Sequence, residues 1–123
     1  MSLIERSAVQ APVLPKETVP MPSLGGEVIV RGLLLSERLT LSALSGQLSE
    51  ALPGESTELA QARAGAQMVS HTLARAVVLA DGQPFYSVAQ WDQFGAKHTG
   101  DVLALFKASR RLDGYDEGDI EKN

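Results

Sequence analysis

The sequence predicts an α+β fold, mainly α, in which an N-terminal β-hairpin is followed by about four helices packed in one small domain. The hairpin is indicated by the alternation of side chains along Glu27–Leu33, which is typical of a strand. The helices are indicated by apolar residues at helical spacing between recognisable start and stop residues. A chain of 123 residues has room for one modest hydrophobic core.

The chain divides into three parts by composition. Residues 1–15 are expected to form a flexible arm, because prolines flank a short apolar stretch that has no periodicity. Residues 16–114 form the predicted domain, and residues 115–123 form an acidic C-terminal tail. The apolar residues of the arm, which we expect to contact other chains, are Leu3, Ile4, Val13 and Leu14.

The predicted hairpin spans residues 16–33. Its first strand is expected at a sheet edge, because Pro20 and Pro22 cannot donate to a ladder. Its second strand places Val28 and Val30 on one face. A lone hairpin is marginal in water and must pack on helices or pair with another chain. We therefore expect Val28 and Val30 to take part in self-association.

Helices are predicted at about residues 36–52, 57–79, 87–96 and 99–113. The first is expected to begin at a Ser36 cap and to end at Pro53-Gly54. Its expected apolar stripe is Leu41, Leu44 and Leu48. The second helix has an expected stripe of Leu59, Ala62, Ala66, Val69, Leu73, Ala76 and Val77.

The last two helices have well-marked ends. Ser87 and Gln90 form a capping box, and Tyr86 and Trp91 occupy the positions of a hydrophobic staple. The final helix is expected to be capped by Thr99, to bury Val102, Leu105, Phe106 and Leu112, and to stop at Gly114 in a left-handed conformation.

The composition excludes several classes of protein. The sequence contains no cysteine, so disulfides and thiolate metal sites are ruled out. The formal net charge of −4 is located in residues 113–123, and the rest of the chain is balanced, so nucleic acid is a disfavoured partner. We expect a cytoplasmic protein without a membrane span, because there is neither a signal peptide pattern nor a long apolar run.

No group of residues has the pattern of a catalytic, cofactor or metal site. His71 and His98 are the only histidines, and neither has a second ligand at helical spacing. Residues 113–123 lack the ligands of a calcium loop at the third and twelfth positions. The basic residues Lys107, Arg110 and Arg111 share a helix face, which is also explained by their place near a helix C-terminus. We therefore expect a protein that is not an enzyme.

The order of these segments resembles the tail assembly chaperone family of long-tailed bacteriophages and prophages. The match rests on the arm and hairpin ending in EVIVRGL, on the Leu-Ser-Glu-Arg start of the first helix, and on the Ala-Asp-Gly-Gln-Pro-Phe segment before a capped helix. It also rests on the leucine-rich last helix, which closes with Arg-Leu-Asp-Gly and leads into an acidic tail ending in Glu-Lys-Asn. The match covers nearly the whole chain.

The resemblance implies a non-enzymatic protein of the host cytoplasm that binds the long tape-measure protein while the tail tube is built. It also implies contact with tail tube protein, absence from the mature virion and, in many relatives, a longer product made by a frameshift near the end of the gene. The codons for residues 121–123 permit such a slip without requiring it. Two alternatives remain open: a structural subunit such as a head–tail connector or minor tail protein, and a small DNA-contacting regulator.

Overall fold

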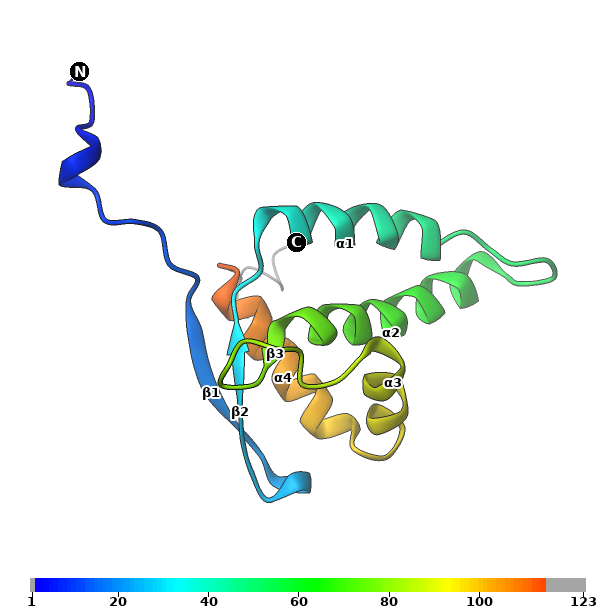
Figure 1. Cartoon of the computed structure of the whole chain (residues 1–123). Helices are drawn as coiled ribbons and strands as arrows, with labels where there is room; N and C mark the ends of the chain where they lie inside the picture. Colours follow the sequence, from blue (N-terminus) through cyan, green and yellow to red (C-terminus); the bar gives the residue numbers. More distant parts are fainter. Residues whose placement is uncertain (1, 115–123) are drawn as a thin grey trace.

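The computed structural model describes residues 2–114 and confirms the α+β fold, with four helices and a small sheet (Figure 1). Two short 3-10 helices, Arg6–Ala8 and Pro22–Leu24, lie in the arm and in the hairpin loop. The strands are β1 (Lys16–Met21), β2 (Gly26–Arg31) and β3 (Val77–Val78). The helices are α1 (Leu35–Leu48), α2 (Thr57–Ala76), α3 (Val88–Lys97) and α4 (Thr99–Leu112).

The sheet is antiparallel in the order β1-β2-β3, so β2 is its central strand. The third strand differs from the prediction, which places Val77 and Val78 at the end of the second helix. The helix ends instead at Ala76, and these two β-branched residues pair with Val30 and Ile29 of β2. Pairing with the hairpin prevailed here over the continuation of the helix.

The core lies between the inner face of the hairpin and the helices α2, α3 and α4. Helix α4 packs against both β1 and β2, and α2 packs against α3 and α4. The aromatic residues before and within α3 form one cluster, in which the rings of Tyr86 and Trp91 lie 5.0 Å apart and meet edge to face. The largest fully buried side chains are Trp91, Met21, Leu73, Leu105, Val30 and Val77.

The burial of Val28 and Val30 corrects their assignment to an interface between chains. Val28 is 7% exposed and Val30 is fully buried, and both belong to the hydrophobic core. Alternation along a strand indicates a buried face, but it does not say whether the cover comes from the same chain or from another. Here the cover comes from the core of the same chain, in which α4 packs against both strands of the hairpin.

One of the three expected helix caps is confirmed. The Ser87 hydroxyl accepts the N–H of Gln90 at 3.2 Å, and the Gln90 side chain accepts the N–H of Ser87 at 2.9 Å. Ser36 is not a cap, because α1 already begins at Leu35 and the Glu37 carboxylate accepts the N–H of Leu34. Thr99 is not a cap either, since its hydroxyl donates to a carbonyl of the preceding helix.

The buried stripe of α2 is rotated from the expected one in its first half. Ala60 and Ala64 are buried, whereas Leu59 is 58% exposed and Ala62 and Ala66 are also exposed. In the second half Leu73 and Ala76 are buried as expected. The difference arises because the start of α2 extends beyond the sheet together with the end of α1 (Figure 1), so the small alanines pack and the leucine faces solvent.

Candidate protein-binding surface

An open groove lies between α1, α2 and α4. Its volume is about 660 Å³. Five of its twelve lining residues have apolar side chains, and the others are polar or charged residues and one glycine. The apolar lining residues are Leu33, Leu41, Met68, Val69 and Phe106, and the others are Arg38, Ser42, Ser45, Gly65, Thr72, Arg110 and Asp113.

Gly65 makes room on the α2 side of the groove. A Cβ atom built at this glycine meets nothing within 4 Å, and the residue is exposed. Glycine within a helix is about 1 kcal/mol less favourable than alanine, so it is a costly choice where no close approach requires it. The missing side chain leaves open the space between α2 and the lining residues of α1.

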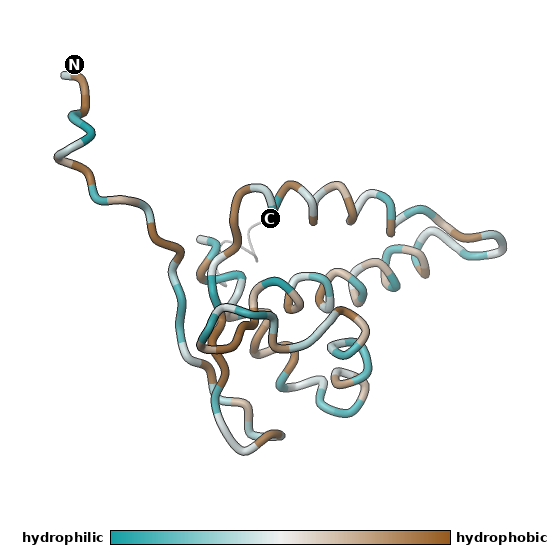
Figure 2. The backbone as a smooth tube through the Cα atoms, in the orientation of Figure 1, coloured by the Kyte–Doolittle hydropathy of each residue, from teal (hydrophilic) through white to brown (hydrophobic). Residues whose placement is uncertain are grey.

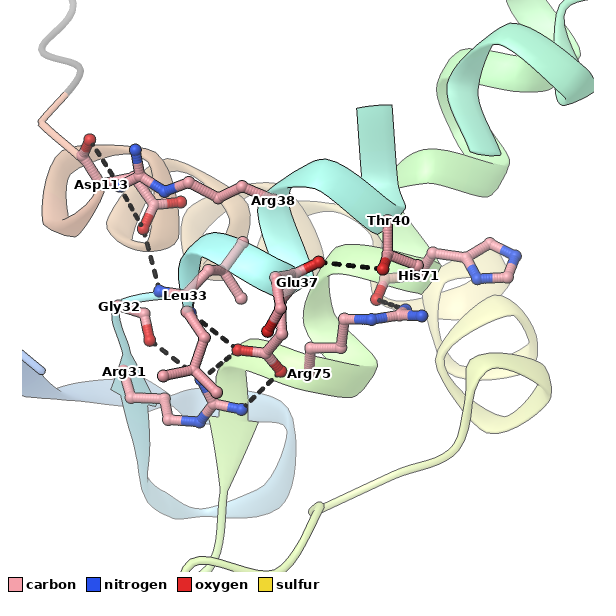
Figure 3. Close-up of polar contacts among 11 residues, drawn as sticks. Arg31, Gly32, Leu33, Glu37, Arg38, Thr40, His71, Arg75 and Asp113 are labelled. Carbon is pink, nitrogen blue, oxygen red and sulfur yellow. Dashed lines mark hydrogen bonds and ion pairs between the residues drawn. The ribbon is translucent and has the colours of Figure 1, made fainter. Parts of the chain in front are cut away.

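Three polar contacts of Asp113 fix one end of the groove (Figure 3). The Asp113 carboxylate accepts the backbone N–H of Leu33 at 3.0 Å and forms an ion pair with Arg38 at 3.2 Å. The Arg38 side chain also donates to the Asp113 carbonyl at 2.9 Å. The end of α4 is thereby joined to the start of α1, and both elements keep their places around the groove.

The same end contains a second ion pair that holds α1 against the hairpin (Figure 3). The two guanidinium nitrogens of Arg31 donate to the two carboxylate oxygens of Glu37, each at 2.8 Å. The hydrogen bonds from Arg31 lower the pKa of Glu37, and the bond from the Leu34 N–H acts in the same direction. The bidentate geometry and partial burial make this contact stronger than an ordinary surface pair.

Arg63 orders the far end, where α1 connects to α2. Its guanidinium donates to the Glu55 carboxylate at 2.9 and 3.0 Å and to the Glu50 carbonyl at 3.1 Å. The hydrogen bonds that the Glu55 carboxylate accepts from Arg63, and then from the Leu52 N–H, lower the pKa of Glu55 to about 2. The loop between the two helices is therefore tied to α2, which sets the distance between the helices.

The N-terminal arm is a separate apolar feature. It runs away from the body of the molecule, and its hydrophobic stretches alternate with hydrophilic ones (Figures 1 and 2). Leu3, Ile4 and Val13 are exposed by 94%, 83% and 85%, and Leu14 is half-buried. These four residues remain candidates for contact with another chain, whereas Val28 and Val30 lie elsewhere, in the core.

Sequence reasoning did not find the groove or the outer face of α1. Leu35 and Leu39 are one helical turn apart and are 72% and 63% exposed, so α1 is apolar toward solvent as well as toward α2. Their spacing was visible in the sequence and could have indicated a second apolar face. The groove has no such signal, because its lining comes from three helices that are distant in the chain.

The histidines and basic residues considered in the sequence analysis lie at packing contacts of the domain. His71 Nδ1 is buried without a hydrogen-bond partner in the described residues, and burial lowers the pKa of this histidine. His98 stacks at 4.6 Å on the Phe94 ring between α3 and α4. Arg111 forms an ion pair with Glu17, and Arg110 lies over the Phe106 ring.

Within residues 2–114 no group of three or more histidine, aspartate or glutamate side chains is arranged to hold a metal ion. The expected acidic tail, residues 115–123, lies outside the described residues. No helix in the described part of the chain is long and apolar enough to cross a membrane.

Comparisons with protein families, with curated proteins and with solved structures found no match to this chain.

Proposed function

We propose that this protein is a non-enzymatic tail assembly chaperone of a bacteriophage or prophage that binds the tape-measure protein during tail tube assembly. The observation that carries the proposal is the amount of apolar side-chain surface that the described residues leave open. It comprises the groove between α1, α2 and α4, the outer leucines of α1 and the N-terminal arm. Exposed apolar surface on this scale is typical of a protein that binds other chains.

The groove has the form expected for a helical segment of the partner. Helices bind in apolar grooves through side chains spaced at three or four residues, and tape-measure proteins are long and rich in helix. Met68, Val69 and Phe106 would contact the apolar face of the bound helix, and Arg38 would remain at the rim. The arm would then cover a neighbouring stretch of the same partner through Leu3 and Ile4.

The proposal places the protein in the cytoplasm of the bacterial host and outside the mature virion. A chaperone has to leave when the tail tube protein polymerises around the tape measure, so contact with tail tube protein is part of the proposal. Release is easier from a shallow, partly polar groove than from a deep apolar one. The mixture of apolar and polar lining residues supports a reversible complex.

Filling the groove tests the proposal. The substitution Gly65→Leu places a side chain in the groove, and nothing lies within 4 Å of the added Cβ. We expect the variant to be at least as stable as the natural protein, since leucine is the better helix former. Co-expressed with the tape-measure protein, it should yield at least about threefold less soluble tape measure than the natural protein does.

The matched control is Gly46→Leu in α1. Gly46 is also exposed with nothing within 4 Å of a built Cβ, but it does not line the groove. This variant should keep the tape-measure protein soluble. A tape-measure protein that is equally soluble alone would contradict the proposed function, and equal effects of the two leucines would place binding away from the groove.

A further inference from the structure

The groove between α1, α2 and α4 begins beside the place where the described residues stop. Asp113 lines the groove, and Gly114 follows it directly. On α1 the lining extends from Arg38 to Ser45, which is about 10 Å of helix. Residues 115–123 come next in the chain and, fully extended, span at most about 30 Å. This segment is therefore long enough to reach the whole groove from its starting point.

The end of α4 has the geometry of a helix stop that reverses the chain. Gly114 has a left-handed conformation with a φ of 93°, and its N–H donates to the Arg111 carbonyl at 3.0 Å. Both features belong to the Schellman motif, in which the N–H of the following residue bonds to the carbonyl one position earlier in the helix. That carbonyl is the one of Arg110, whose side chain lines the groove. The motif directs the chain back beside the last turn of α4.

We propose that residues 115–123 occupy the groove of their own chain, with Tyr115 and Ile120 against its apolar lining. These two are the large apolar residues of the segment. Met68 and Phe106 in the lining are only half-buried, so they have apolar surface whose burial is favourable. The tyrosine covers the entrance beside α4, and the isoleucine covers the part farther along α1 and α2.

Charge favours this segment as the occupant. It carries four acidic side chains and one lysine. Arg38 and Arg110 are basic lining residues, and among the lining residues of the described chain Asp113 alone is acidic and is paired with Arg38. Lys107, one helical turn before Arg110, adds a further positive charge. The N-terminal arm has one acidic and one basic side chain and offers no such complementarity.

In this arrangement the groove is covered whenever no partner is bound. The acidic tail keeps the apolar lining from nonspecific association, and a partner helix has to displace it. The apparent affinity for the partner is then reduced by the fraction of molecules whose groove is covered. This competition rests on the proposed function, whereas the occupancy itself is measurable in this chain alone.

Disulfide formation measures the occupancy. The chain has no cysteine, so the double variant Gly118→Cys with Ser45→Cys introduces one pair of thiols. Ser45 lines the groove. The matched control combines Gly118→Cys with Ala43→Cys, because Ala43 is exposed on the face of α1 opposite the lining residues. Ser42→Cys provides a second groove position, so the result does not depend on one substitution.

The effective concentration of the two thiols is read from equilibrium with glutathione, at a protein concentration low enough to keep the reaction within one molecule. We expect it to be at least about tenfold higher for the groove pair than for the control pair. Sodium chloride at about 0.5 M should reduce this difference, because it screens the acidic tail from the basic rim. Ile120→Ser in the groove pair should reduce it as well, since an apolar contact is lost.

Filling the groove provides the last arm of the experiment. Gly65→Leu should lower the effective concentration of the groove pair, and Gly46→Leu, which lies outside the groove, should leave it unchanged. Urea unfolding of the reduced variants shows that each is folded. Equal effective concentrations for the groove and control pairs would overturn the proposal. So would disulfides that form only between two molecules, because the tail of a second copy would then be the occupant.

Discussion

A few polar side chains decide how the helices of this small protein are placed. Glu37 accepts hydrogen bonds from Arg31 and from the Leu34 N–H, so one carboxylate both starts α1 and attaches it to the hairpin. Asp113 does the same for the end of α4 through Leu33 and Arg38. Both carboxylates are charge-assisted acceptors with little exposure, which is where single hydrogen bonds contribute most.

The Glu37 contact predicts a dependence of stability on acid. Because the pKa of Glu37 is lowered in the folded protein, its contribution is present above about pH 4.5 and is lost as the pH falls through the lowered value. Glu37→Gln should cost about 1–2 kcal/mol at pH 7 and should flatten the fall in stability below about pH 4.5. Urea unfolding at several pH values measures both effects.

Glu5→Gln is the control for this measurement. Glu5 is an exposed residue of the arm and lies just before a short 3-10 helix. Its substitution should leave the unfolding free energy and its pH dependence unchanged. If the Glu37 and Glu5 variants lose stability along the same curve, the ion pair with Arg31 contributes nothing measurable.

At the level of the elements, the starts of α3 and α1 are fixed in different ways. A local cap fixes the start of α3, and tertiary contacts fix the start of α1. Ser87→Ala removes the hydroxyl that accepts the Gln90 N–H and should cost about 1 kcal/mol of unfolding free energy. Ser36→Ala removes a hydroxyl that caps nothing in α1 and should stay within about 0.5 kcal/mol of the natural protein. Equal losses would mean that the capping box does not stabilise α3.

The same contrast explains how much of the structure the sequence predicted. The hairpin, the four helices and the Ser87 cap follow from local patterns, and the structure confirms them. The start of α1 depends on Arg31, six residues before Glu37, which a local rule does not consider. The strand order, the rotation of α2 and the groove arise from packing between distant segments, so periodicity alone did not predict them.

At the scale of the whole molecule, the N-terminal arm makes its hydrogen bonds separately from those of the domain. The carbonyl of Pro15 is bonded to Gly32, but the hydrogen bonds of residues 5–9 are local. The arm therefore adds apolar surface for partners without adding to the core. Its residues contribute to what the protein binds and not to how firmly the domain folds.

Deletion of residues 1–12 tests this separation. The unfolding free energy should change by less than about 0.5 kcal/mol, because Leu3 and Ile4 contact no core residue. The yield of soluble tape-measure protein on co-expression should fall, since the arm would no longer cover it. A loss of more than about 1 kcal/mol in urea unfolding would show that the arm belongs to the folded domain.

The contacts between the hairpin and α4 have a consequence for synthesis. Ser23 bonds to Asp101, Leu33 to Asp113 and Glu17 to Arg111, across 78, 80 and 94 residues of chain. A ribosome makes the hairpin first and its cover last, so the nascent chain carries an uncovered apolar sheet for most of its translation. The domain closes only when its last helix has been made. Any segment translated after Gly114 would thus follow a domain whose parts are already complete.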